Sequence, residues 1–186
     1  NMGGAIALGL AVSGEIEPQN ITVIDHRGKN VQRLKSVSEE LNVVVADYSS
    51  LKEADIVIVA VKPWIVEELL TMHKEAFGNA NQLIVSDAAI VTLAQLQEWT
   101  SPQHPVFRVV PNTAIAVRQS MTYITSLNAN KEQEEQVFQI FSLLGKAEIV
   151  SEKLIPAITS LTSCGIAFAF RYIRAAMEGG IEMGIY

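Results

Sequence analysis

Two features near the start of the sequence are typical of a dinucleotide-binding site. The stretch NMGG contains a glycine pair, Gly3 and Gly4, at the beginning of an apolar helical pattern. Asp25 follows Gly3 by 22 residues and ends a β-branched run. In a Gly-x-Gly-x-x-Gly turn the third glycine lets a helix pack closely on a strand, and an acid roughly 20 residues later binds the ribose hydroxyls. The spacing therefore predicts that Asn1 and Met2 belong to a phosphate-binding turn and that Gly3 is its last glycine.

The residues after the acid give conflicting indications of cofactor choice. The carboxylate of Asp25 favours the free ribose diol of NADH, whereas Arg27, next to His26, could pair with the 2'-phosphate of NADPH. Arg27 could also be a solvated loop cation, and the glycine pair could simply begin a helix. We therefore expect NADPH or NADH as the cofactor, with a slight preference for NADH.

A further polar pair follows a later strand. The stretch FRVVPNTAIAVRQSMT, residues 107–122, places the amide of Asn112 and the hydroxyl of Thr113 directly after an apolar run. Open α/β sheets bind ligands at the carboxyl ends of their strands, so both residues are candidates for positioning substrate or nicotinamide. Asn112 could equally brace a turn by bonding its own backbone. No spacing of Cys and His indicates a metal site.

Short β-branched runs alternate with amphipathic stretches, which predicts parallel strands joined by helical crossovers in a doubly wound sheet. The expected strands are Ile21–Asp25, Val43–Ala46, Ile56–Val61, Leu83–Ser86 and Val106–Val110. A hairpin-like pair near Tyr123 and Ile149 is expected to flank a helix from Lys131 to Leu144, which Gly145 ends. From Glu152 onward the pattern is helical. We therefore expect a Rossmann dinucleotide-binding domain over residues 1–150 and the start of a helical domain over 151–186.

Composition excludes several classes of partner. The chain has 186 residues, 49% of them hydrophobic and 18% charged, with a formal net charge of −6. This charge argues against a nucleic-acid partner, which would need a surplus of Lys and Arg. The uncharged stretch Leu154–Phe170 contains Pro156 and Gly165, so we expect a buried helix and no membrane partner. A single cysteine, Cys164, favours a reducing compartment and hence a cytoplasmic location.

Five motifs together resemble the pyrroline-5-carboxylate reductase family in order and spacing. They are NMGGAI, ADIVIVAVKP, VSDAAIVTLAQL, RVVPNTAIAVRQSMT and ITSLTSCGIAFAFRYIRAAMEGGIEMGI, and they extend over essentially the whole chain. The resemblance implies reduction of 1-pyrroline-5-carboxylate to proline with NADPH or NADH. It also implies a Rossmann domain followed by an all-helical dimerisation domain, truncated here at both ends. The first strand of the family's sheet and its later Ser-Pro-Gly-Gly-Thr stretch would then lie outside this sequence.

The resemblance also assigns site residues by motif. For the cofactor these are Asn1, Met2, Gly3, Asp25, His26, Arg27, Asp47, Ala60, Val61, Lys62, Pro63, Asp87, Ala88 and Ala89. For positioning substrate or nicotinamide they are Asn112, Thr113, Ser163, Cys164 and Gly165, with no certain catalytic residue. The chain departs from the family pattern at Ile90, where a glycine is usual, and in residues 162–168, where the family's Ser-Gly-Ser-Gly-Pro-Ala-Tyr becomes TSCGIAF.

The last helical stretch favours a homodimer or a higher homo-oligomer. Ile166, Phe170, Ile173 and Met177 fall on one stripe, and the helix is apolar on most of its circumference, so it needs partners. Small residues around this stripe allow close helix approach.

Two alternative functions remain: a β-hydroxyacid-dehydrogenase-like oxidoreductase, which would need a glycine-rich segment and a catalytic lysine, and a catalytically silent dinucleotide-binding dimer module.

Overall fold

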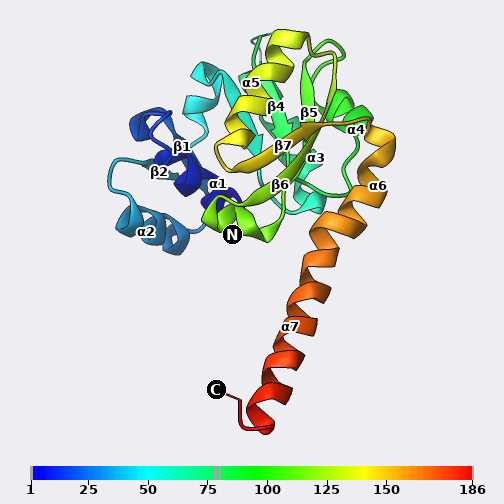
Figure 1. Cartoon of the computed structure of the whole chain (residues 1–186). Helices are drawn as coiled ribbons and strands as arrows, with labels where there is room; N and C mark the ends of the chain where they lie inside the picture. The colour runs from blue at the N-terminus through cyan, green and yellow to red at the C-terminus, as the bar shows by residue number, and fades with distance from the viewer. Residues whose placement is uncertain (1, 78, 80, 186) are drawn as a thin grey trace.

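The computed structural model of the chain describes residues 2–77, 79 and 81–185 and shows an α/β body followed by a projecting helical arm (Figure 1). The body contains the strands β1 (Thr22–Asp25), β2 (Asn42–Val45), β3 (Ile56–Val59), β4 (Leu83–Ser86), β5 (Val106–Val110), β6 (Ser120–Leu127) and β7 (Gly145–Ile149). Its helices are α1 (Met2–Ala11), α2 (Gly28–Val37), α3 (Pro63–Met72), α4 (Leu93–Trp99) and α5 (Lys131–Ser142). The five predicted strands are confirmed, with ends that differ by at most two residues.

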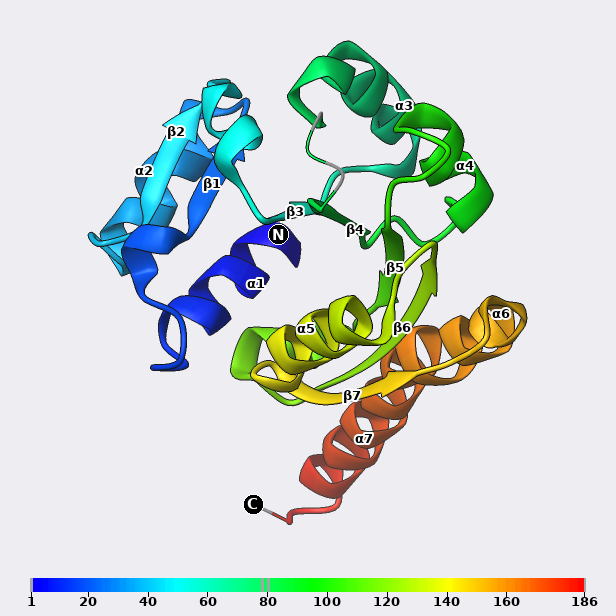
Figure 2. The same ribbon diagram turned by 90° about the horizontal axis from the view of Figure 1, so that it is seen from above.

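Among the described residues the strands form two sheets. Strands β1 and β2 pair in parallel, and a five-stranded sheet has the order β3-β4-β5-β6-β7. In the larger sheet β3, β4 and β5 are parallel, whereas β6 runs antiparallel to β5. Helix α1 starts beside the end of β3, on the side toward β1 and β2 (Figure 2). That a further strand joins the two sheets stays a prediction from the family resemblance.

The expected hairpin-like pair is wrong in its direction. Strands β6 and β7 are parallel, with Ser120 opposite Gly145 and Ile124 opposite Ile149. The reason is the connection between them: the twelve-residue helix α5 returns the chain to the same end of the sheet, as a crossover does and a tight turn does not. A capping box at Asn130 and Gln133 begins this helix.

Helices cover both faces of the larger sheet, as a doubly wound fold requires. On one face α1 and α5 pack Ile6, Leu10 and Phe141 against Phe107 and Ile124. On the other face α3 and α4 cover a second cluster, which includes Val66, Leu70, Ile84, Leu96 and Val106. Successive strand residues point to opposite faces, so Val106 and Phe107 belong to different clusters.

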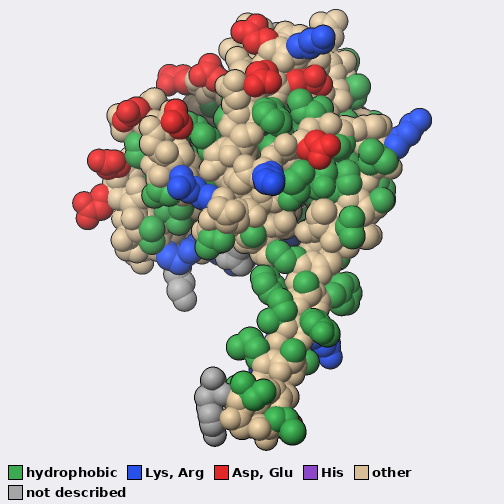
Figure 3. Space-filling model, viewed as in Figure 1, with side chains coloured by type: hydrophobic (Ala, Val, Ile, Leu, Met, Phe, Trp, Pro, Cys, Tyr) green, Lys and Arg blue, Asp and Glu red, His purple; other side chains and the backbone are tan. Residues whose placement is uncertain are grey.

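The helical arm comprises residues Glu152–Glu182, with a short first turn at Glu152–Leu154, α6 (Ile155–Ile158), a π-helical segment at Thr159–Cys164 and α7 (Gly165–Glu182). The expectation of a buried helix is wrong for this chain. Ile155 is buried, but α7 has no buried residue, and Figure 3 shows hydrophobic side chains along it. The physical reason is that no other helix of the described chain packs along α7. By length and composition alone the arm could cross a membrane, a test that core helices also pass.

Candidate functional site

The carboxyl ends of three parallel strands form the edge at which the sequence places most of the candidate residues. The register pairs Val59 of β3 with Ser86 of β4, and Ser86 with Arg108 of β5. The residues that follow these strands, from Ala60, Asp87 and Pro111 onward, therefore leave the sheet at the same edge. Open α/β sheets bind ligands at this edge.

Helix α1 begins against the end of β3, and Gly3 makes this approach possible. A Cβ atom at Gly3 would lie 2.8 Å from the Cβ of Ala60, closer than real Cβ atoms approach. This is the close helix–strand packing expected of the third glycine in a dinucleotide-binding turn. Met2 is half-buried and packs against the adjacent core, whereas Asn1 lies outside the described residues. The amino-terminal end of α1 thus faces the candidate cofactor edge, where its free N–H groups favour an anion.

Asp25 ends β1 in a fixed orientation. One carboxylate oxygen accepts a hydrogen bond from the backbone N–H of Arg27 (2.7 Å), and the other accepts one from Nδ2 of Asn30 (2.9 Å). Each oxygen keeps a second acceptor position, so the carboxylate can still accept hydrogen bonds from hydroxyl groups. The Nε of Arg27 donates to Nε2 of the neighbouring His26 at 3.1 Å. The guanidinium of Arg27 therefore lies beside the imidazole of His26.

Asp47 follows β2 in an exposed loop. Its Oδ1 accepts a hydrogen bond from the backbone N–H of Ser49 at 3.0 Å, and hydrogen bonds from Ser49 lower the pKa of this carboxyl. The next residue, Tyr48, stacks on His73 at the end of α3, with ring centroids 4.0 Å apart. This stacking ties the loop after β2 to the larger sheet's helices.

The segment after β3 turns directly into a helix. Ala60 and Val61 are half-buried, Lys62 occupies the N-cap position of α3, and Pro63 is its first residue, where proline's missing N–H costs nothing. The Nζ of Lys62 lies 6.0 Å from the ring centroid of Trp64. The predicted strand end at Val61 therefore lies two residues too late, because the chain must leave the sheet to start α3.

The segment after β4 holds a half-buried acid, Asp87. Burial raises the pKa of Asp87 to about 6, well above the usual value for an aspartate. Ala88 is buried, with its N–H 3.2 Å from the Oγ of Ser86, and the carbonyl of Ala89 accepts a hydrogen bond from Arg108. Ile90 is exposed. A protonatable carboxyl thus stands at the same edge as Ala60 and Lys62.

Asn112 braces the turn after β5 and also contacts the arm. Its Oδ1 accepts a hydrogen bond from the N–H of Ala114 (3.0 Å), and its Nδ2 donates to the carbonyl of Thr162 (3.4 Å). Thr113 is exposed. The first contact is the turn role that the sequence allowed for Asn112, and the second ties the edge of the sheet to the arm.

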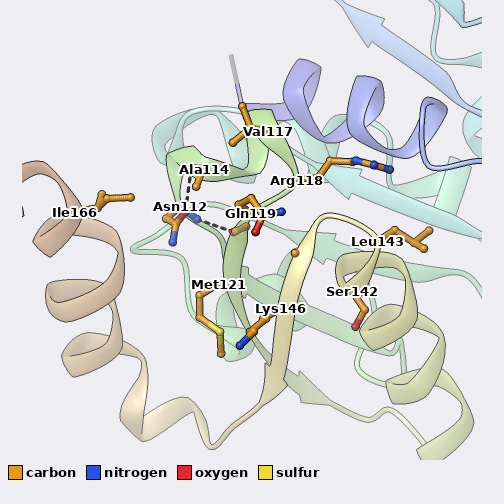
Figure 4. A pocket seen from close by; sticks show the side chains of 12 residues that line it. Asn112, Ala114, Val117, Arg118, Gln119, Met121, Ser142, Leu143, Lys146 and Ile166 are labelled. Carbon is orange, nitrogen blue, oxygen red and sulfur yellow. Dashed lines mark hydrogen bonds between the residues drawn. The ribbon is translucent and has the colours of Figure 1, made fainter. Parts of the chain in front are cut away.

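The arm residues named by the resemblance lie next to this contact. Ser163 and Gly165 are half-buried, whereas Cys164 is exposed. A groove of about 580 Å³ lies mostly on the body, where Asn112 lines it, and reaches the arm at Ile166 (Figure 4). The structure therefore brings residues 162–166 to Asn112 and away from Asp25, which lies on the other sheet. No three His, Cys, Asp or Glu side chains of the described chain lie close enough to hold a metal ion.

Reasoning from sequence overlooked a polar cluster formed by Arg108 and Glu152. Arg108 is buried in the middle of β5, and its Nη1 lies 3.3 Å from Oε1 of Glu152 at the start of the arm. The signal was present, because a single charged residue interrupts the apolar run VFRVV. A buried charge in a strand needs a partner, but the sequence does not show which one.

A glycine-started helix, a parallel sheet edge and an acid at the end of a neighbouring strand define the Rossmann class of nucleotide-binding folds. The family model described as "NADP oxidoreductase coenzyme F420-dependent" matches residues 1–90. Pyrroline-5-carboxylate reductase of Corynebacterium melassecola is 32% identical over 187 residues, which cover 99% of this chain and 68% of that protein. The chain belongs to the pyrroline-5-carboxylate reductase family.

Two further comparisons describe the extent of the likeness. Pyrroline-5-carboxylate reductase of Arabidopsis thaliana is 34% identical over 185 residues, covering 99% of this chain and 66% of that protein. A structure of Plasmodium falciparum pyrroline carboxylate reductase with NADP bound superimposes with a TM-score of 0.88 at 25% identity, covering 100% of this chain and 67% of the other. The chain thus spans about two thirds of the length of these relatives.

Proposed function

We propose that the full-length protein reduces 1-pyrroline-5-carboxylate to L-proline by hydride transfer from NADH or NADPH, as the last step of proline biosynthesis. The observation that carries the proposal is the extent of the likeness, which includes the arm as well as the α/β body. A likeness confined to the body would support nucleotide binding alone. Because the relatives are longer, the activity belongs to the complete protein.

The residues at the sheet edge fit a nicotinamide dinucleotide. The end of α1 supplies free N–H groups for the pyrophosphate, and Asp25 keeps acceptor positions for ribose hydroxyls. We propose a preference for NADH, because a 2'-phosphate would approach the carboxylate of Asp25. Asp25→Ser is then expected to weaken NADH binding by about 1 to 3 kcal/mol, the value of a hydrogen bond to a charged group. NADPH binding to the same variant is the control and is not expected to weaken.

The proposed chemistry needs positioning more than a side-chain acid. The cofactor would supply the hydride to the imine carbon, and the imine nitrogen can take its proton from water. Positioning alone accounts for a large part of such a rate enhancement. Asn112 would act by holding the turn and the arm in place, so Asn112→Ala is expected to lower melting temperature and turnover together. Loss of turnover at an unchanged melting temperature would instead assign Asn112 to the site itself.

We also propose an obligate homodimer, or a higher homo-oligomer built from dimers. The large side chains of α7 support this, because Phe170 is 61% exposed and Met177 is 62% exposed in the single chain. Such a helix needs an apolar partner, and an obligate interface buries more than about 2,000 Å². Light scattering of the full-length protein at low micromolar concentration tests this, and Ala176→Glu is expected to dissociate the dimer. A stable, active wild-type monomer would contradict it.

We further propose a cytoplasmic location, supported by the single cysteine.

The decisive experiment for the function is a substrate comparison. Full-length protein is expected to oxidise NADH or NADPH when 1-pyrroline-5-carboxylate is added. It is expected not to reduce the oxidised cofactor with open-chain β-hydroxyacids. The reverse result would support the dehydrogenase alternative, and nucleotide binding without turnover would support a silent dimer module.

A further inference from the structure

Arg108 is a buried cation in the middle of β5, and its surroundings supply few partners. Arg108 is 7% exposed. The residues opposite it on the two neighbouring strands are buried and uncharged, namely Ser86 and Thr125. A guanidinium loses its hydration on burial, so it must be compensated by acceptors that are fixed in place. Those acceptors come from two distant segments of the chain.

The first acceptor lies in the candidate cofactor edge. Nη2 of Arg108 donates to the carbonyl of Ala89, in the loop between β4 and α4. Asp87 and Ala88, the other cofactor candidates of this segment, directly precede Ala89. The position of this loop therefore depends on a side chain that comes from the neighbouring strand.

The second acceptor lies at the root of the arm. Nη1 of Arg108 donates to Oε1 of Glu152 at 3.3 Å, and the same oxygen accepts a hydrogen bond from the N–H of Leu93 at 2.9 Å. Glu152 is the first residue of the arm, and Leu93 is the first residue of α4. One carboxylate thus connects the arm both to β5 and to the helix that follows the loop.

The planar guanidinium sets the geometry of both contacts at once. Its donors form a rigid fork, so a shift of the loop relative to the arm would break one bond or the other. Nε of Arg108 finds no hydrogen-bond partner among the described residues, so these two contacts account for its compensation. In the turn after this strand, Asn112 forms the second polar tie to the arm, through the carbonyl of Thr162.

We infer that Arg108 and Glu152 form a latch that positions the Asp87–Ile90 loop and the root of the arm relative to each other. Arg108 is a positioning residue, which acts through the carbonyl of Ala89 and the carboxylate of Glu152. The loop carries cofactor candidates, and the arm carries Ser163 to Gly165. The latch therefore aligns the two halves of the candidate site. Its effect on turnover rests on the proposed reductase function, whereas its structural coupling does not.

Hydrogen exchange of the full-length protein tests the coupling directly. Glu152→Gln keeps an oxygen for the N–H of Leu93 but removes the charge that faces Arg108. It is expected to speed amide exchange by about fivefold or more in residues 87–90, to which Glu152 is linked through Arg108. Arg108→Lys is expected to speed exchange both there and in residues 152–158, because one ammonium cannot replace the fork. Lys153→Met, which removes an exposed charge next to Glu152, is the matched control and is expected to change neither segment.

Kinetics separate positioning from stability alone. The kinetics are measured well below the melting temperature. There, Arg108→Lys and Glu152→Gln are each expected to raise the cofactor KM and to lower kcat, which together lower kcat/KM about tenfold. The double variant is expected to lose no more than either single variant, because both remove the same link. Unchanged exchange in residues 87–90 of Glu152→Gln, or additive kinetic losses, would overturn the latch. Absence of wild-type turnover would reject the reductase function, and the exchange result would still decide the latch.

Discussion

The α/β body and the helical arm are both rich in large apolar side chains, yet only the body buries them. Phe107 in β5 is fully buried, whereas Phe170 in α7 is 61% exposed. The body surrounds its sheet with helices on both faces, so each apolar stripe meets another (Figure 2). The arm leaves the body after Ile155, and no other helix of the described chain packs along α7 (Figure 1).

This contrast separates two sources of stability. In the body, burial of apolar area provides the favourable free energy. Along α7 of a single chain, backbone hydrogen bonds, helix propensity and the exposed Arg174–Glu178 ion pair act, and these are marginal in water. Substitutions of the same kind should therefore have different effects in the two regions.

The largest difference is expected for loss of a phenylalanine ring. Phe107→Ala leaves a cavity between α5 and the sheet and is expected to lower the free energy of unfolding by about 3 to 5 kcal/mol. Phe170→Ala removes an exposed ring and is expected to change the free energy of unfolding of the single chain by less than about 0.5 kcal/mol. Urea unfolding followed by circular dichroism measures both. A loss of similar size in the two variants would show that the arm is buried in the isolated chain.

The next contrast is between two glycines, one in the body and one in the arm. Gly145 has a φ of 140°, and a Cβ atom there would collide with the backbone of Ser120 in β6, whereas a Cβ atom on Gly179 of α7 would meet nothing within 4 Å. Gly145→Ala is expected to cost about 3 kcal/mol or more, through overpacking and a strained backbone. Gly179→Ala is expected to stabilise the helix by about 0.5 to 1 kcal/mol. Thermal unfolding of both variants checks this, and a tolerated Gly145→Ala would mean that β6 and β7 can move apart.

The sequence predicted the elements of the body because their signals are local. Strand runs such as LIVS at Leu83–Ser86 and VFRVV at Val106–Val110 match the observed strands residue for residue. The parallel order of these strands followed from their alternation with helices. The packing of Gly3 on Ala60 agrees with the predicted role of Gly3 as the third glycine of the turn, because that glycine allows a helix and a strand to pack closely.

The remaining features depend on contacts that the sequence does not contain. The direction of β7 was missed because a hairpin was expected, although the helix between the two strands is long enough to return the chain to the start of β6 and so makes them parallel. The exposure of the Leu154–Phe170 stretch was missed because an uncharged run does not show whether a partner is present, whereas the need of the last helical stretch for partners was predicted from its apolar circumference. The pairing of Arg108 with Glu152 joins residues 44 positions apart, which a single sequence cannot reveal.

Titration offers a finer test, because the described groups with clearly shifted pKa values all lie in the body. The folded state raises the pKa of Asp87 from 3.8 to about 6, so between these values the folded chain binds more protons than the unfolded chain. Stability therefore falls as pH rises through this window. Asp87→Asn removes this dependence and is expected to gain about 1 to 3 kcal/mol on wild type between pH 4 and pH 7. A constant difference between the two proteins across this range would contradict the burial of the Asp87 carboxyl.

The smallest effect is expected at the opposite end of the sheet and has the opposite sign. His104, 3% exposed, precedes β5, and its burial lowers the pKa of the imidazole below 6.5. As pH falls below 6.5, the unfolded chain gains a proton that the folded chain resists, so stability falls with acidification. His104→Leu replaces the imidazole with an apolar group of similar size. It is expected to reduce the loss of stability at acidic pH. The measurement is the difference between wild type and variant in free energy of unfolding at pH 7.5 and pH 5.5. A decline of equal slope in both proteins would assign the acid sensitivity to another group of the body.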